Sequence, residues 1–178
     1  FKYCVWYTFN KSGFNNIVKR NAKLFNTYKY PAHITIKSNI SDLNEARMVA
    51  DRYRAIHPIF VPYGTPKQSH VRLMHGIQMI DFYAIEQPLM VNGFETDIHV
   101  SLAYKNEPFT DMELAVANAN IPTSIDPKEL NVCVMNCFCD KPEGWFKLSH
   151  EAQNISPKMA SFVRNSIPQS LDGSQIKL

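Results

Sequence analysis

Two short motifs in this chain combine a histidine with a hydroxyl residue two positions later: HIT at residues 33–35 and HVS at residues 99–101. Successive side chains of a strand point to opposite faces, so the histidine and the hydroxyl of each motif would share one face. Histidine titrates near neutrality and can serve as general base or general acid. A hydroxyl can donate a hydrogen bond to a phosphate oxygen. Each motif would therefore place a potential acid or base beside a hydrogen-bond donor on one face of a strand.

We assign the catalytic role to four residues: His33 and Thr35 from the first motif, and His99 and Ser101 from the second. The sequence does not distinguish the acid from the base. For either histidine alone, a buried imidazole bonded to the backbone would be the simpler interpretation. Both motifs, however, lie in apolar, alternating segments that precede a helix, and this shared context favours catalysis.

Substrate contacts are expected from two cations and two aromatic rings. Lys37 would share the face of His33 and Thr35, and Arg72 would share a face with His70; either cation could hold a phosphate. Nucleobases stack on flat side chains. Of six candidate rings we select Tyr7 and Phe94; the full set is Tyr3, Trp6, Tyr7, Phe94, Tyr104 and Trp145.

The elements that must position these residues follow from hydrophobic periodicity and turn signals. Helices are expected over residues 14–25, 42–56, 110–119 and 156–167, with Ser41 or Asp42 and then Thr110 as caps. Strands are expected over residues 2–9, 33–37, 58–64, 69–85, 88–94 and 97–104, followed by a hairpin over 131–149 that turns at KPEG. This order predicts an α+β fold with an antiparallel or mixed sheet.

With 178 residues, 45% of them hydrophobic, the chain is expected to form one domain over residues 1–150, followed by a C-terminal helix and polar tail over 151–178. A net charge of +3 is compatible with an anionic substrate but is too low for a protein that coats nucleic acid. No apolar run is long enough to span a bilayer, and no signal peptide opens the chain. Because the first residue is Phe1, we expect a domain excised from a longer polypeptide.

The chain has four cysteines: Cys4, Cys133, Cys137 and Cys139. Three of them fall at alternate positions of a predicted strand and would share a face. Their spacing lacks the short turn that brings two thiolates onto a zinc ion. We therefore expect no metal and no cofactor, with reduced, partly buried thiols in a reducing compartment. A zinc-stabilised interaction domain is the alternative.

The paired motifs HIT and HVS resemble those of the 2H phosphoesterase superfamily, and the resemblance covers roughly residues 2–148. It implies a bilobal 2H phosphoesterase fold, in which two antiparallel sheet lobes enclose a central cleft and helices lie outside. The Tyr- and Asn-rich composition and the apparent excision favour the viral 2′,5′-phosphodiesterases found in coronaviruses, toroviruses and rotaviruses. The second motif carries Ser101 where many relatives have threonine, which keeps the hydroxyl.

The resemblance implies a metal-independent phosphodiesterase that cleaves short oligonucleotides, above all 2′,5′-oligoadenylates, and so antagonises an antiviral RNA-decay pathway. Such an enzyme would be a cytoplasmic monomer, in the host cytoplasm if viral, with a short oligonucleotide or cyclic nucleotide as its partner and no membrane. RNA ends with 2′,3′-cyclic phosphates and cyclic dinucleotides are alternative substrates. A non-catalytic nucleotide-binding module is the alternative of another class.

Overall fold

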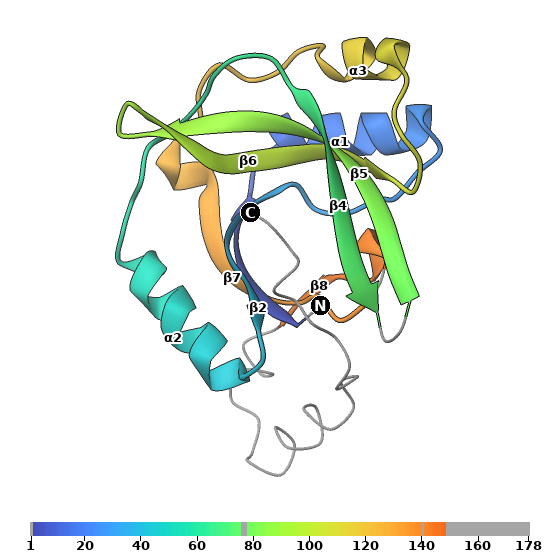
Figure 1. The fold of residues 1–178 in the computed structure, drawn as a ribbon. Coiled ribbons are helices and arrows are strands. Elements are labelled where there is room, and N and C mark those ends of the chain that lie inside the picture. Colours follow the sequence, from blue (N-terminus) through green and yellow to red (C-terminus); the bar gives the residue numbers. More distant parts are fainter. Residues whose placement is uncertain (1, 76–77, 140, 149–178) are drawn as a thin grey trace.

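The computed structural model describes residues 2–75, 78–139 and 141–148, which form an α+β fold (Figure 1). Its helices are α1 (Ser12–Leu24), α2 (Leu43–Arg54) and α3 (Asp111–Ala117), with short 3₁₀ turns η1 (Pro127–Glu129) and η2 (Pro142–Gly144). Its strands are β1 (Tyr3–Phe9), β2 (His33–Ile40), β3 (Phe60–Pro62), β4 (Lys67–His75), β5 (Gln78–Val91), β6 (Phe94–Lys105), β7 (Leu130–Asn136) and β8 (Phe146–Lys147). Every strand pair in the described residues is antiparallel, which confirms the predicted class.

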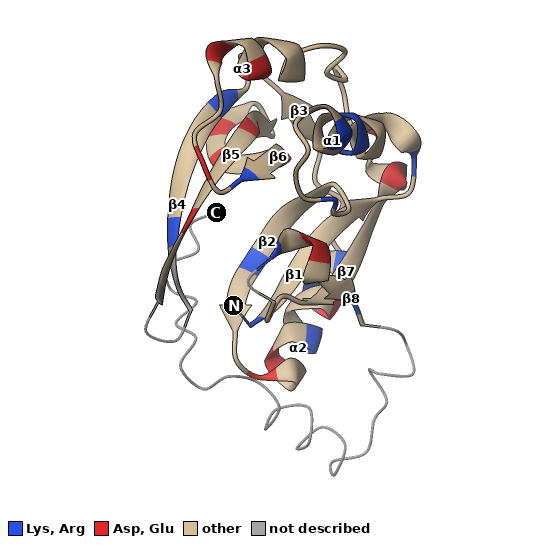
Figure 2. Cartoon of the chain, turned by 90° about the vertical axis from the view of Figure 1, so that its right-hand side faces the viewer, with Lys and Arg blue, Asp and Glu red and all other residues tan. Residues whose placement is uncertain are grey.

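The strands form one sheet in which two groups meet at a single point. In one group β5 has β6 on one edge and β3 and β4 on the other. The second group continues from β2 through β1 and β7 to β8. Among the described residues, β2 pairs with β6 only at Ile34 and Val100. Figure 2 shows β4 and β5 lying apart from β2, β1 and β7. Both His-x-hydroxyl motifs lie at this junction.

The helices cover the face of the sheet that carries Ile34 and Val100. Helix α1 buries Phe14, Ile17 and Val18 in the cluster that contains these two residues. Helix α2 buries four residues against the other strand group, among them Leu43 and Val49, which pack with Tyr3, Val5 and Val134. Their apolar side chains recur at helical spacing, so each helix buries one stripe against this face of the sheet.

A bulge in β6 is stabilised by α1. Ile85 pairs with Ala103 but Glu86 pairs with Ser101, so Leu102 is an extra residue in β6. Asn21 of α1 is fully buried, and its Nδ2 donates to the carbonyl of Leu102 at 3.1 Å. This hydrogen bond satisfies a buried carbonyl at the bulge and fixes α1 over the strand that carries the second motif.

Most predicted elements are confirmed, with two corrections. The segment 69–85 is not one strand, since β4 ends at His75 and β5 begins at Gln78 and the two pair antiparallel. Strand β5 also continues through Pro88, whereas we predicted that one strand ends at residue 85 and another begins at residue 88. A register shift beside Pro88 accommodates its missing N–H.

The predicted caps and hairpin are present. Asp42 accepts from the Asn44 N–H, and Thr110 forms a capping box with Glu113. Strand β7 pairs with β8 around η2, but it ends at Asn136, earlier than expected. The predicted helix over 156–167 and the polar tail lie outside the described residues. Among the helices described, none has the length and apolar character to cross a membrane.

The Asn21 hydrogen bond can be tested by Asn21→Ala, with Asn16→Ala on the exposed face of α1 as control. The first change leaves the Leu102 carbonyl buried without its partner, and should lower the free energy of unfolding by about 1–3 kcal/mol in urea titration. Asn16→Ala should change it by less than about 0.5 kcal/mol. Equal effects of the two changes would contradict a role for the hydrogen bond.

Candidate active site

The junction of β2 and β6 brings the two motifs side by side. Antiparallel register around Ile34 and Val100 sets His33 across from Ser101 and Thr35 across from His99. Ile34 and Val100 are both buried beneath the helices. Because side chains alternate, the four motif residues project from the other face. In both motifs the histidine and the hydroxyl residue therefore lie on one face of the sheet and the aliphatic residue lies on the other, as predicted.

His33 lies in an aromatic environment and is 5% exposed. Its ring stacks on Trp6, with ring centroids 3.4 Å apart and an interplanar angle of 5°. Its Nδ1 lies 2.8 Å from the carbonyl oxygen of Pro31. Burial lowers the pKa of His33 to about 4; the Pro31 hydrogen bond opposes this shift, and nearby His99 adds to it. His33 is therefore neutral at pH 7, and an Nδ1–H donated to Pro31 leaves the Nε2 lone pair free.

His99 faces a hydrogen-bond acceptor at each ring nitrogen. Its Nδ1 lies 3.1 Å from the Asp97 carbonyl oxygen, and its Nε2 lies 3.3 Å from Oε1 of Glu86. Ser69 of β4 donates to the same Glu86 oxygen at 2.6 Å. His99 therefore lies beside a carboxylate that β4 and β5 hold in place, whereas the ring of His33 lies among aromatic side chains.

The hydroxyl of Ser101 is buried and oriented by a tyrosine. Tyr104 donates its hydroxyl to Ser101 Oγ at 3.0 Å, and Tyr30 donates to the Ser101 carbonyl, also at 3.0 Å. Burial raises the pKa of the Tyr104 hydroxyl far above its usual value, so it remains a donor. Ser101 can therefore direct its own proton elsewhere. Thr35 has no hydrogen bond from its hydroxyl within the described part of the chain.

Aromatic rings gather beside His33 on this face. Trp145 lies 5.8 Å from both Trp6 and Tyr104, centroid to centroid, with its ring nearly perpendicular to each. Phe82 lies 6.5 Å from Tyr104. A pocket of about 320 Å³ adjoins His99, and Tyr63, Lys67 and Glu86 are among its lining residues. The face thus offers rings for stacking next to a polar cavity.

Neither selected aromatic residue lies at the histidines, although Trp6, Tyr104 and Trp145 from the wider set do. Tyr7 pairs with Ile34, so it points to the helix-covered face, where its ring meets Phe60 at 5.4 Å. Phe94 is 74% exposed at the tip of the β5–β6 hairpin. It lies five residues from His99 along the strand, which is roughly 16 Å.

The two selected cations also lie elsewhere. A register shift in the β1–β2 pairing sets Lys37 opposite Val5, whereas Thr35 is opposite Trp6. Lys37 therefore lies on the helix side, 3.2 Å from Glu45 of α2, and the prediction that it shares the face of His33 is wrong. Arg72 does share a face with His70, and both contact Asp81. Alternation along β5 puts Asp81 on the face opposite Glu86.

Glu86 and Ser69 are the site residues that sequence reasoning missed. Glu86 is a carboxylate inside an apolar strand segment, FYAIEQP, and its side chain is only 13% exposed. Charged residues are rarely buried without a partner, so this position carried a usable signal. Ser69 had no signal of its own, because its contact depends on the β4–β5 register.

The cysteines form part of the apolar support for Trp6. Cys4, Cys133 and Cys137 are buried in one cluster with Trp6 and Met135. All four cysteines are free thiols. Burial raises the pKa of Cys137, which also lies beside Cys4. In the described residues no group of three or more potential ligands is arranged to hold a metal ion.

Comparisons with known proteins gave no assignment: no family model, curated protein or solved structure matches this chain.

The burial of His33 predicts a pH dependence of stability. The unfolded chain takes up a proton at His33 near pH 6.5, the folded chain only near pH 4. Between these values the unfolded state binds more protons, so the free energy of unfolding falls as pH falls. From pH 7 to pH 5 the parent should lose about 2 kcal/mol more than His33→Gln, measured by urea titration. Equal losses would show that His33 is not buried in its neutral form.

Proposed function

We propose that this protein is a metal-independent phosphodiesterase of the two-histidine type, acting on short oligonucleotides. The observation that carries the proposal is the register at Ile34 and Val100, which aligns two histidines and two hydroxyls on one face. A single such histidine would be unremarkable. Two of them on one face, one a buried neutral imidazole and the other beside a carboxylate, match the needs of acid–base phosphoryl transfer. The two strand groups on either side of the junction are compatible with a bilobal 2H phosphoesterase fold.

In the proposed reaction His33 is the base and His99 the acid. For a 2′,5′-linked substrate, His33 Nε2 takes the proton of the ribose 3′-hydroxyl as its oxygen attacks phosphorus. The bond to the 5′-oxygen breaks, and His99 Nε2–H protonates that leaving oxygen. The products are a 2′,3′-cyclic phosphate and a 5′-hydroxyl, so protons and electron pairs balance. Ser101 and Thr35 donate to the non-bridging oxygens, where charge is held.

Glu86 has to exchange partners during this cycle. In the free protein its carboxylate lies at the His99 nitrogen that would face the leaving oxygen. A bound phosphodiester carries negative charge and can replace the carboxylate as acceptor, which leaves Glu86 bonded to Ser69. The Glu86 contact thereby orients His99 Nε2 until substrate arrives.

The favoured substrate is a 2′,5′-oligoadenylate, with the silencing of an antiviral RNA-decay pathway as its consequence. Support comes from Trp145 and Tyr104, two partly exposed rings on the histidine face that could stack an adenine. The cavity beside His99 could take the neighbouring nucleotide. RNA ends with 2′,3′-cyclic phosphates and cyclic dinucleotides would use the same four residues. The Glu86–His99 contact favours a second candidate, a nucleotide-binding module in which the acid stays blocked.

The proposal is tested by cleavage assays in EDTA, with chromatographic product analysis. Matched 2′,5′- and 3′,5′-linked triadenylates, a 2′,3′-cyclic nucleotide and a cyclic dinucleotide are offered to the parent, His33→Ala and His99→Ala. Each change removes an acid–base group and should lower kcat by about 10²–10⁴-fold. Lys37→Gln serves as control, because Lys37 pairs with Glu45 on the other face, and should retain parent activity. Binding without turnover in the folded parent would favour the module.

The pH profile tests the role of His33 separately. A base must be unprotonated in the free enzyme, so kcat/KM should fall on the acid side only as His33 takes up its proton. The expected acid limb therefore lies near pH 4, the pKa to which burial lowers His33. An acid limb near pH 6.5 in a fully folded enzyme would mean that the base is a solvated histidine instead.

A further inference from the structure

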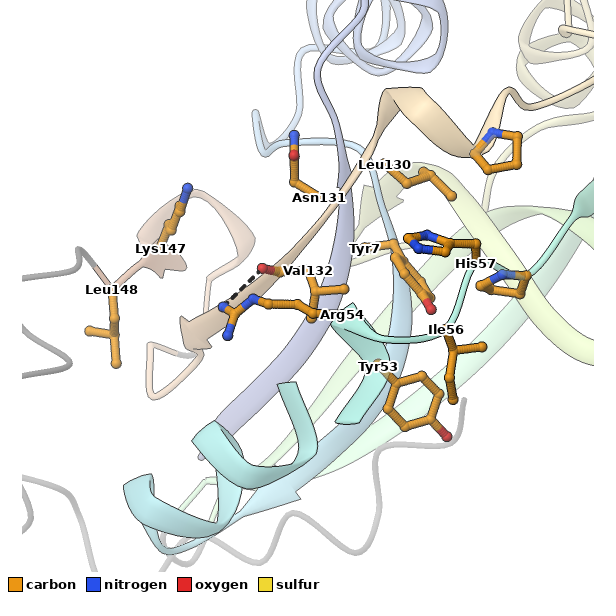
Figure 3. Close-up of a pocket in the computed structure, with 12 residues that line it drawn as sticks. Tyr7, Tyr53, Arg54, Ile56, His57, Leu130, Asn131, Val132, Lys147 and Leu148 are labelled. Carbon is orange, nitrogen blue, oxygen red and sulfur yellow. Dashed lines mark hydrogen bonds between the residues drawn. The ribbon is translucent and has the colours of Figure 1, made fainter. Parts of the chain in front are cut away.

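A second pocket lies on the opposite face of the sheet from the histidines, between the end of α2, the segment after it and β7 (Figure 3). Its volume is about 330 Å³, at the small end for ligand sites. Tyr7 and Val132 pair across β1 and β7 and point into it, while Trp6 and Cys133 point the other way. Its polar lining consists of Tyr7, Tyr53, Arg54, His57, Asn131 and Lys147, with no carboxylate among the described lining residues.

Arg54 is held in place over β7. Its Nη2 donates to the Val132 carbonyl at 3.2 Å, drawn as the dashed line in Figure 3. Its Nη1 lies 2.7 Å from Asp51, a carboxylate that is 75% exposed and does not line the pocket. These contacts use two of the five N–H groups of the guanidinium. A positioned guanidinium with spare donors is well suited to a phosphate.

Tyr7 supplies an independent sign of a missing partner. The residue is 4% exposed, and its hydroxyl has no hydrogen-bond partner among the described residues. In Figure 3 the hydroxyl points toward Ile56 and Tyr53, on the side of the pocket where His57 also lies. Burial, with a smaller contribution from Tyr53, raises the pKa of Tyr7 to about 12, so the group is a donor at neutral pH. A buried donor without an acceptor is unfavourable, and an acceptor from a ligand would satisfy it.

A smaller apolar recess adjoins this pocket. It has a volume of about 150 Å³, and Ile34, Phe60, Val91 and Ile98 line it together with Thr35 of the first motif. The two cavities share Tyr7, Tyr53, Ile56 and Pro58 as walls. A molecule that spans both would place its charged group near Arg54 and an apolar ring between aromatic and aliphatic side chains.

We propose that these two cavities form a binding site for a nucleoside monophosphate, with the phosphate at Arg54 and the base in the apolar recess. Recognition would combine the guanidinium, the Tyr7 hydroxyl and the flat faces of Tyr7, Tyr53 and Phe60. The larger pocket lies on the face opposite the histidines, whereas the recess also borders Thr35 of the first motif. Binding at this site does not depend on phosphodiesterase activity.

The experiment is a calorimetric titration of the full chain with AMP, a phosphomonoester that the proposed phosphodiesterase would not cleave. Arg54→Gln should raise Kd at least tenfold, because the phosphate loses its bidentate partner. Arg52→Gln is the matched control, an exposed arginine of the same helix, and should leave Kd unchanged. Tyr7→Phe should raise Kd several-fold without lowering the Tm of the free protein, which separates a binding role from a structural one.

Amide chemical shifts in the same titration locate the ligand. Shifts at Tyr53, Arg54 and Val132 would support the proposal, whereas shifts confined to β2 and β6 around the motifs would overturn it. If Arg54→Gln and Arg52→Gln raised the Kd for AMP equally, the effect would be one of non-specific charge, and the proposal would be overturned. Inorganic phosphate is a further probe. If it bound as tightly as AMP, the apolar recess would have no role, and the site would not be one for a nucleotide.

Discussion

The whole candidate site depends on one antiparallel pair, Ile34 with Val100. Both residues are buried in the core beneath α1, so the hydrophobic effect fixes which face of β2 and β6 points inward. A shift of one residue in either strand would send a histidine into that core and an aliphatic side chain to the open face. The apolar members of the motifs therefore determine the geometry of the polar ones, even though they take no part in the chemistry.

The two histidines differ because their neighbours differ. Three aromatic rings border His33, stacked or edge-on, and its Nδ1 lies at the Pro31 carbonyl. Burial among these rings disfavours a charged imidazole. His99 lies against a carboxylate that β4 and β5 position together. The two histidines of equivalent motifs thus lie in different surroundings, which the neighbouring strand supplies: aromatic from β1 for His33, and a carboxylate from β5 for His99. The asymmetry that acid–base catalysis needs is provided by the sheet rather than by the motifs.

The sequence was sufficient for the α+β class, the caps at Asp42 and Thr110, and the facing of each histidine with its hydroxyl, because these follow from local periodicity. It was insufficient wherever a bulge or a long-range strand pairing decides which face a side chain occupies or where a strand ends. Strict alternation along β2 predicts that Lys37 shares the face of His33. A register shift opposite Val5 turns Lys37 to the helix side instead. Local alternation also could not tell which of Tyr7 and Trp6 shares the face of the histidines, because neighbouring residues of β1 face opposite ways and the pairing with β2 decides between them. The break between β4 and β5 was missed although Gly76 interrupts the apolar run, because the residues on both sides have strand character.

The position of β1 between β2 and β7 has a consequence for how the chain reaches this structure. Strand β1 pairs with β7 through residues more than 120 positions apart, while its pairing with β2 spans only about the length of α1 and a loop. On a ribosome, the first strand emerges long before its second partner exists. Loop closure over so many residues is slow, and proteins dominated by such contacts fold slowly. Until β7 arrives, one edge of β1 and the apolar surface around Trp6 stay uncovered, an interval in which exposed strand edges are prone to aggregation.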